Sequence, residues 1–257
     1  MTPQLLHTVL ITGATGAIGQ ALALYYAKPG VHLLLQGRNT EGLTALAENC
    51  KGRGATVTMQ ILDLRDIPRL QQWVSQLTES NLPDLIIANA GININQGSQR
   101  RGETWQEIEA LLDLNIKSTF ALVNALLPAL RQRGSGQIAL ISSLAAYYGL
   151  PITPSYCASK AALKAYGEAM RSWLAREGIH INVVMPGYIQ SDMCDAMPGP
   201  KPFLISPELA AQRIAKGLAK NQARISFPFP LNFGTWCLAV LPPDFSSRLL
   251  RLINYGG

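Results

Sequence analysis

The sequence predicts an α/β fold in a single domain: a doubly wound parallel sheet of about seven strands, with helices on both faces. Three observations lead to this prediction. Short β-branched or aliphatic runs alternate along the chain with longer amphipathic segments. Most of the short runs are continuously apolar, as expected of parallel strands that are covered on both faces. The first run ends in a glycine-rich turn that opens a helix.

The composition is that of a folded globular protein. The chain has 257 residues, of which 48% are hydrophobic and 15% are charged, and these values exclude disorder. Its 22 glycines and 16 prolines form no repeat, which excludes collagen-like and low-complexity classes. A chain of this length buries a large core without disulfides, so we expect residues 1–257 to form one domain.

Charge and cysteine content exclude several classes of partner. The formal net charge is +6, but the basic residues are scattered and only Arg100-Arg101 forms a tight cluster, so no nucleic-acid partner is expected. The four cysteines form no Cys-x-x-Cys pair and no histidine cluster accompanies them, so no metal site is expected. Free thiols suit a reducing cytoplasm. We expect a cytoplasmic protein, since neither a signal peptide nor a membrane-length apolar run is present.

The elements follow one another in strand–helix order. The strand candidates are Thr8–Ile11, Val31–Gln36, Thr56–Ile61, Leu85–Ala88, Gln137–Ile141, Ile179–Met185 and Arg224–Phe227. Helical periodicity is clearest over Thr104–Leu130 and Ser155–Arg176, and Pro128 is expected to end or kink the last turn of the first of these. Ser206 is a candidate N-cap for a helix that ends near Lys220.

The turn after the first strand has the sequence Thr12-Gly13-Ala14-Thr15-Gly16-Ala17-Ile18-Gly19. Glycines at these places allow a tight turn and a close approach of a pyrophosphate to main-chain N–H groups. The helix N-terminus adds a partial positive charge. The turn therefore predicts a Rossmann-type dinucleotide site.

The end of the second strand, Gln36-Gly37-Arg38-Asn39, indicates which nicotinamide cofactor binds. An acidic residue there would bind the ribose of NAD(H) and repel a 2′-phosphate, and the sequence has none. Arg38 can hold a phosphate through paired hydrogen bonds, and the Thr15 hydroxyl is a second candidate. We expect NADP(H) to be preferred, with NAD(H) as the alternative.

Tyr156 and Lys160 form the candidate catalytic pair. Residues four apart lie on one face of a helix, so both side chains can reach one ligand. A free phenol has a pKa near 10, and a nearby ammonium together with a cationic nicotinamide should lower it. Ser143 follows the fifth strand and is preferred over Ser142, on spacing, as the group that holds a substrate carbonyl oxygen.

Taken in order, these motifs resemble those of the short-chain dehydrogenase/reductases, and the likeness extends to about residue 220. Ala17 stands where the classical branch usually has the middle glycine of Thr-Gly-x-x-x-Gly-x-Gly. The spacing of Gly13, Gly16 and Gly19 fits the extended branch equally well. The length of the chain and its later motifs favour the classical branch.

The resemblance implies further site residues. Asn89-Ala90-Gly91 would lie beside the adenosine ribose, and Asp63-Leu64 would flank the adenine ring. Asn115 would fix a water that joins Lys160 to solvent. The segment that would hold the nicotinamide carboxamide includes Pro186, Gly187, Ile189 and Ser191, the last in place of the usual threonine.

The predicted reaction is reversible carbonyl reduction, in which NADPH gives hydride to the carbonyl carbon and Tyr156 is the general acid. Lys160 would bind the nicotinamide ribose, and Ser143 would orient the oxygen. Residues 192–207 are expected to form a lid. The expected walls indicate a small apolar carbonyl or alcohol substrate: Met193, Met197, Phe203 and Leu204 in the lid, and Tyr147, Tyr148, Leu150 and Ile152 opposite.

The sequence also fits two other functions, and it leaves the role of the C-terminal segment open. The chain could be a non-catalytic NADP(H)-binding sensor or scaffold, or an epimerase or dehydratase of the extended branch. The apolar segment 222–257 could complete the pocket, mediate oligomer contacts or, less favoured, lie on a membrane surface. The resemblance makes a homodimer or homotetramer the default.

Overall fold

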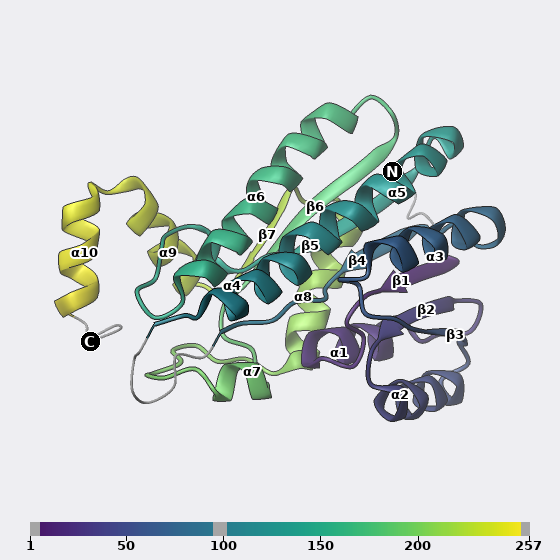
Figure 1. The fold of residues 1–257 in the computed structure, drawn as a ribbon, viewed down its shortest axis with the longest axis horizontal. Helices are drawn as coiled ribbons and strands as arrows, with labels where there is room; N and C mark the ends of the chain where they lie inside the picture. The colour runs from purple at the N-terminus through teal and green to yellow at the C-terminus, as the bar shows by residue number, and fades with distance from the viewer. Residues whose placement is uncertain (1–5, 95–101, 253–257) are drawn as a thin grey trace.

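A parallel sheet runs through the middle of the protein in the computed structural model, which describes residues 6–94 and 102–252 (Figure 1). The sheet has 7 strands in the order β3-β2-β1-β4-β5-β6-β7, with every pairing parallel. The strands are β1 (Thr8–Ile11), β2 (His32–Gly37), β3 (Thr56–Ile61), β4 (Leu85–Ala88), β5 (Gly136–Ile141), β6 (Ile179–Pro186) and β7 (Arg224–Phe227). The predicted fold class is confirmed. The Arg100-Arg101 cluster and residues 253–257 of the apolar tail lie outside the described residues.

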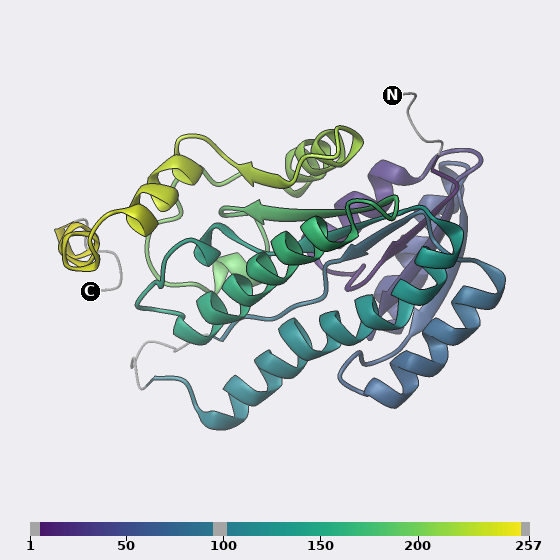
Figure 2. The same ribbon diagram turned by 90° about the horizontal axis from the view of Figure 1, so that it is seen from above.

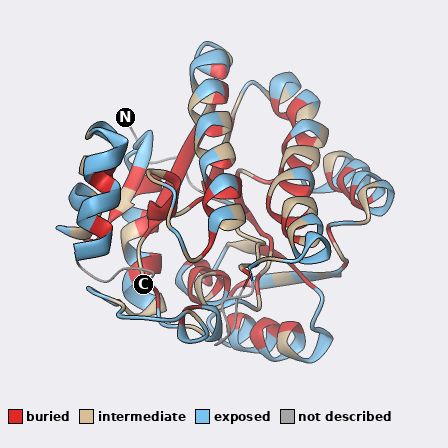
Figure 3. Cartoon of the chain, turned by 60° about the vertical axis from the view of Figure 1, so that its left-hand side comes forward, coloured by how far each residue is buried: buried red, intermediate tan, exposed pale blue. Residues whose placement is uncertain are grey.

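Two layers of helices enclose the sheet, as Figure 2 shows from above. The helices and helical turns are α1 (Ala17–Tyr26), α2 (Thr40–Gly52), α3 (Ile67–Ser80), α4 (Trp105–Leu112), η1 (Asp113–Lys117), α5 (Ser118–Arg133), η2 (Leu144–Ala146), α6 (Pro154–Leu174), α7 (Asp192–Asp195), α8 (Pro207–Ala219), α9 (Leu231–Val240) and α10 (Pro243–Leu252). One core cluster joins α1, α2 and α8 to the sheet, and a second joins α3, α5 and α6 to its other face. Figure 3 shows the buried residues on the helix sides that face the sheet.

Most strands are apolar because both faces are covered. All four residues of β4 are buried, and β6 is buried at seven of its eight positions. The edge strand β3 is the exception, with an alternation of exposed and half-buried residues. It pairs on one side only, with β2, which explains why its sequence, Thr-Val-Thr-Met-Gln-Ile, is mixed.

The long helical segment differs from the prediction. A π-helical turn, η1, separates α4 from α5, and Pro128 does not end the helix, since α5 continues past it to Arg133. Buried leucines on both sides of the proline, Leu126, Leu127 and Leu130, pack the helix onto the core. Their packing outweighs the one hydrogen bond that proline removes.

The same continuous helix, Trp105–Arg133, is long and apolar enough to span a membrane, with a mean hydropathy of 1.3. Its most apolar 18-residue stretch is 50% buried, and α5 packs against α3, so it serves as a core helix of this fold. The chain ends in two helices, α9 and α10, which stand at one end of the molecule (Figure 1). The helix predicted after Ser206 is present as α8, and the Ser206 side chain accepts the N–H of Leu209.

Candidate active site

A cavity of about 910 Å³ opens where the strands end, at the carboxyl edge of the sheet. Nineteen of the twenty-one predicted catalytic and cofactor-binding residues line it. They are Gly13, Thr15, Gly16, Ala17, Ile18, Arg38, Asn39, Asp63, Leu64, Asn89, Ala90, Gly91, Ser143, Tyr156, Lys160, Pro186, Gly187, Ile189 and Ser191. The remaining two, Gly19 and Asn115, lie behind the wall and support it.

The main chain of the glycine turn packs closely against Ala90, after β4, and against α1. Gly13 has a φ of +60°, and a Cβ there would lie 2.8 Å from Ala90 Cα. A Cβ on Gly19 would lie 2.4 Å from the Gly13 carbonyl oxygen, so α1 can pack on the turn only with glycine at that position. Gly16 caps α1 without a side-chain hydrogen bond. The first turn of α1 therefore presents main-chain N–H groups to the cavity, as an anion site requires.

Two polar residues that hold this turn were missed by the sequence analysis. Gln36 Oε1 accepts the N–H of Gly13 at 3.1 Å, and Gln36 Nε2 donates to the Leu62 carbonyl at 2.6 Å. Thr12 Oγ1 accepts the N–H groups of Asn89 and Ala90 at 3.0 and 3.1 Å. Both side chains are buried at the ends of strands. A polar residue that ends an otherwise apolar strand was the available signal.

Asn89 also supports the turn. Its amide donates to the carbonyls of Thr12 and Gly13, at 3.0 Å in each case. Asn89 therefore ties the end of β4 to the end of β1, and it does so while still lining the cavity. Its amide is thus committed to the protein main chain.

The rim near Arg38 carries three charges. Asp63 is held by Arg65, whose Nε and Nη2 donate to its carboxylate at 3.1 and 2.6 Å. Arg38 Nη1 lies 3.6 Å from the same carboxylate, and the Arg38 side chain is 56% exposed. The hydrogen bonds from Arg65 lower the pKa of Asp63 to about 2. Because Arg65 already pairs with the carboxylate, the three side chains together leave one positive charge at the rim.

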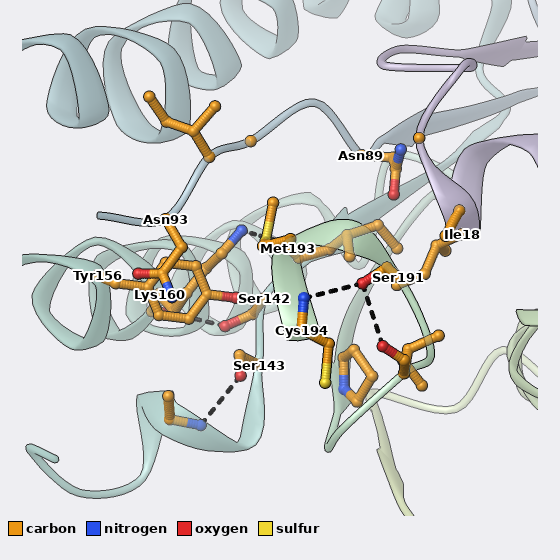
Figure 4. Close-up of a pocket in the computed structure, with 18 of the residues that line it drawn as sticks. Ile18, Asn89, Asn93, Ser142, Ser143, Tyr156, Lys160, Ser191, Met193 and Cys194 are labelled. Atoms are coloured by element: carbon orange, nitrogen blue, oxygen red, sulfur yellow. Dashed lines mark hydrogen bonds between the residues drawn. The ribbon is translucent and has the colours of Figure 1, made fainter. Parts of the chain in front are cut away.

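Tyr156 and Lys160 project from α6 into the cavity, with Ser143 nearby at the end of β5 (Figure 4). Lys160 Nζ lies 5.5 Å from the centre of the Tyr156 ring and donates to the Ile141 carbonyl at 3.0 Å. Ser143 Oγ accepts the N–H of Ala145 at 3.1 Å. The neighbouring Ser142 is buried and donates to the Lys160 carbonyl at 2.7 Å, so its hydroxyl is used within the protein.

Burial controls the proton affinities of this pair. It raises the pKa of Tyr156 to about 12, although a hydrogen bond with Ser143 acts in the opposite direction. It lowers the pKa of Lys160 to about 8. Desolvation of the phenolate is the largest cause of the raised pKa of Tyr156. The predicted lowering of the phenol pKa includes the charge of a bound cationic nicotinamide, so it stays a prediction.

Asn115 lies in the π-helical turn η1 and is fully buried. Its Oδ1 accepts the N–H of Ile92 at 2.8 Å, while its Nδ2 donates to the Ile92 carbonyl at 2.9 Å and to Ser159 Oγ at 3.1 Å. A Cβ on Gly91 would lie 3.1 Å from Asn115 Oδ1 and 3.3 Å from Lys160 Nζ. Asn115 thus fixes the segment after β4 against α6.

The lid side of the cavity begins at Ser191. Its Oγ accepts the N–H of Cys194 at 3.1 Å and donates to the Ile189 carbonyl at 3.1 Å, which starts the short helix α7 (Figure 4). Met193 and Met197 line the cavity as expected. Phe203 and Leu204 were expected to line it too, but they are 52% and 43% exposed and are not among its described lining residues.

The opposite wall also differs from the prediction. Leu150 lines the cavity, but Tyr147 and Tyr148 line a second cavity beside it, and Ile152 lines neither. The missing wall comes from the C-terminal helices, through Leu231, Gly234, Thr235, Leu238, Leu249 and Leu250. Of the roles expected for segment 222–257, these residues fulfil completion of the pocket.

Comparison with known proteins finds one family. Residues 7–199 match the family model described as short chain dehydrogenase. An uncharacterized oxidoreductase of Myxococcus xanthus is 32% identical over 248 residues, which cover 96% of this chain and 97% of the relative. The 3-oxoacyl-(acyl-carrier-protein) reductase FabG of Rickettsia conorii is 33% identical over 190 residues, 74% of this chain and 76% of the relative.

A solved structure shares the whole fold. A short-chain dehydrogenase from Sphingobium yanoikuyae, in complex with NADPH, superposes with a TM-score of 0.81 at 25% identity. The match covers 95% of this chain and 94% of that one. The similarity therefore includes the C-terminal part beyond the segment that matches the family model.

Proposed function

The chain belongs to the short-chain dehydrogenase family, and we propose that it interconverts a carbonyl group and a secondary alcohol of an apolar substrate with NADP(H). One observation carries the proposal. Tyr156, Lys160 and Ser143 lie together in the same cavity whose other end is formed by the glycine turn and Arg38. Hydride transfer from a dinucleotide requires a general acid and an anion-binding site in one cavity.

The residues present fit NADP(H). The uncapped start of α1 and the close approach of Gly13 to Ala90 suit a pyrophosphate, which binds main-chain N–H groups. Arg38 suits a 2′-phosphate, since its guanidinium lies at the rim and Asp63 is already paired with Arg65. The NADPH complex of the Sphingobium yanoikuyae relative supports this assignment. NAD(H) is the weaker alternative, because no acidic side chain follows β2 at the ribose position.

Further contacts of the cofactor follow from the lining residues. Asn39 follows Arg38 in the sequence, and Thr15 lies in the glycine turn, so both would contact the cofactor beside Arg38. Asp63 and Leu64 would flank the adenine. Ile189 and Ser191, after Pro186 and Gly187, would hold the carboxamide. The other contacts would come from the glycine turn and the end of β4, through Gly16, Ala17, Ile18, Asn89, Ala90 and Gly91, while Gly19 would support the turn from behind.

When bound, the nicotinamide supplies hydride to the carbonyl carbon or accepts it from the alcohol carbon. Tyr156 gives its proton to the carbonyl oxygen during reduction and takes it back during oxidation. A pKa of about 12 makes the phenol a proton donor at neutral pH in the protein alone. Lys160, with a lowered pKa, can return a proton to the phenolate, while Asn115 positions the segment beside it. Ser143 holds the carbonyl oxygen.

The substrate is proposed to be apolar because the cavity walls near the acid are apolar. Leu144, Leu150, Leu231, Leu238 and Met193 line the same cavity as Tyr156. A sugar would leave many hydroxyls without partners against such walls, at a cost in binding free energy. The similarity to a 3-oxoacyl-(acyl-carrier-protein) reductase is in keeping with a carbonyl substrate on an apolar chain.

We also propose that the protein acts in the cytoplasm as a homodimer or homotetramer. Large side chains stay exposed on the outer helices, with Trp105 at 71% and Trp173 at 60%. Aromatic side chains are enriched where protein chains meet. Sedimentation velocity measures the oligomeric state directly, and a monomer at micromolar concentration would contradict this part of the proposal.

The test of the function is the Tyr156→Phe variant, assayed by NADPH oxidation with apolar ketones and aldehydes. Loss of the general acid should reduce turnover by about 10²–10⁴-fold. NADPH affinity, measured by fluorescence titration, should change by less than about twofold, since the phenol is not needed to hold the cofactor. Tyr166→Phe is the matched control on the same helix, where the ring stacks on Phe120. Turnover above a tenth of wild type in Tyr156→Phe would refute the assignment.

A further inference from the structure

A second cavity, of about 870 Å³, lies directly beside the first. It is formed between the turn after β5, the start of α6 and the last helix α10. Three residues, Ala145, Leu150 and Leu250, line both cavities. These three residues therefore belong to the wall that the two cavities share, and Ala145 is the smallest of them.

The shared wall is close to the reacting groups. Ala145 follows Ser143 by two residues, and its N–H donates to the Ser143 hydroxyl at 3.1 Å. Cys157, the neighbour of Tyr156 on α6, lines the second cavity and is buried. A substrate whose carbonyl oxygen reaches Ser143 and Tyr156 would therefore lie next to the wall that the two cavities share.

The second cavity has the chemistry of a site for a hydrocarbon group. Its walls are small and mostly apolar, and they include Ala146, Gly149, Pro151, Pro154, Ala158 and Ala161. Such short side chains leave open the space that larger ones would fill. Among its described lining residues Arg251 is the one charged side chain. A cationic group would thus be disfavoured there, and a neutral chain accepted.

The cover of this cavity is anchored to the fold. The Tyr148 hydroxyl lies 3.3 Å from the Pro243 carbonyl and 3.2 Å from Ser247 Oγ, both at the start of α10. Ser246 is fully buried, and its hydroxyl donates to the Leu238 carbonyl in α9 at 2.9 Å. These hydrogen bonds fix α10 to α9 and to the turn after β5. The cavity is therefore a formed part of this structure.

We propose that the second cavity binds the distal apolar arm of the substrate, so that the enzyme acts on carbonyl compounds that carry a long or bulky hydrocarbon substituent. The inference rests on the proposed function, since it assumes that the carbonyl is held at Ser143 and Tyr156. The arm passes Ala145 and Leu250. Each methylene group that becomes buried there should improve binding about fourfold.

The first test compares methyl ketones from butan-2-one to decan-2-one. In the wild type, kcat/KM should rise with chain length once the arm reaches the second cavity. Ala161→Leu narrows this cavity from an exposed position on α6 and should lower the ratio of kcat/KM for decan-2-one to that for butan-2-one about tenfold. Ala169→Leu makes the same change on the same helix, at an exposed position that lines neither cavity, and should leave the ratio unchanged.

A second test does not depend on turnover. Calorimetry should show that decan-2-one binds more weakly to Ala161→Leu than to the wild type or Ala169→Leu, while butan-2-one binds all three alike. If every ketone is inert although NADPH binds, the proposed function fails, and the calorimetric comparison alone decides about the cavity. Equal ketone binding by all three proteins would overturn the inference. The inference would also be overturned if Ala161→Leu changed the sedimentation coefficient but left the ratio of kcat/KM for the two ketones unchanged. That result would mean that a second copy of the chain covers the second cavity.

Discussion

Asn115 and Ile92 exchange two hydrogen bonds between the side-chain amide of one and the main chain of the other. The N–H of Ile92 donates to Asn115 Oδ1 at 2.8 Å, and Asn115 Nδ2 donates to the Ile92 carbonyl at 2.9 Å. Ile92 lies beyond the end of β4, and the Asn115 amide gives its main chain the hydrogen-bond partners that a neighbouring strand gives within the sheet. It therefore fixes the cavity wall at Gly91, where Asn115 Oδ1 and Lys160 Nζ both approach.

The Asn115→Ala variant should lower the free energy of unfolding by about 3 kcal/mol, because two main-chain groups of Ile92 lose their partners in a partly buried place. Urea denaturation followed by circular dichroism measures the change. Asn49→Ala is the control, since Asn49 is an exposed residue in α2. A loss below about 1 kcal/mol would mean that water replaces the amide.

Lys160 should make stability depend on pH. Burial lowers its pKa to about 8, whereas the group titrates near 10.5 in the unfolded chain. Between these values the unfolded chain binds more protons, so the free energy of unfolding rises with pH. The cost of the buried charge is fully present below about pH 8 and disappears near pH 10.5. From pH 7 to pH 10 the wild type should therefore gain about 2–3 kcal/mol relative to Lys160→Met.

The measurement is parallel urea denaturation of both proteins across this pH range. Taking the difference between them removes the contributions of groups that they share. A difference that stays constant with pH would show that Lys160 keeps an ordinary pKa in the folded protein.

Arg38→Leu should distinguish the two nicotinamide cofactors. Loss of charge-assisted hydrogen bonds to a 2′-phosphate should weaken NADPH binding about 10–100-fold and leave NADH binding nearly unchanged. Fluorescence titration with each cofactor measures this. Arg69→Leu is the matched control, because Arg69 is exposed on α3 and does not line the cavity. Equal weakening for both cofactors would assign Arg38 a structural role instead.

Gly19→Ala should be severely destabilising although it adds one methyl group. The new Cβ would lie 2.4 Å from the Gly13 carbonyl oxygen and 2.9 Å from Ala14 Cα, so the turn and α1 must move apart. We expect a loss of about 2 kcal/mol or more in the free energy of unfolding and weaker NADPH binding. Gly52→Ala, where a Cβ meets nothing within 4 Å, should be neutral or slightly stabilising. Equal thermal unfolding midpoints for the two variants would contradict the packing argument.

The sequence by itself determined the order of strands and helices, the glycine turn and the pairing of Tyr156 with Lys160. These features depend on local periods, since strands repeat every two residues and helices every 3.6. The N-cap at Ser206 is local in the same sense.

Only the tertiary structure decided the features that depend on burial. Pro128 stays inside α5 because Leu126 and Leu130 are packed on the core, and the pKa of Tyr156 is raised because the surrounding protein desolvates it. The C-terminal helices became a wall of the cavity in place of Tyr147. Each outcome depends on which distant residues meet, and a period along the chain holds no information about that.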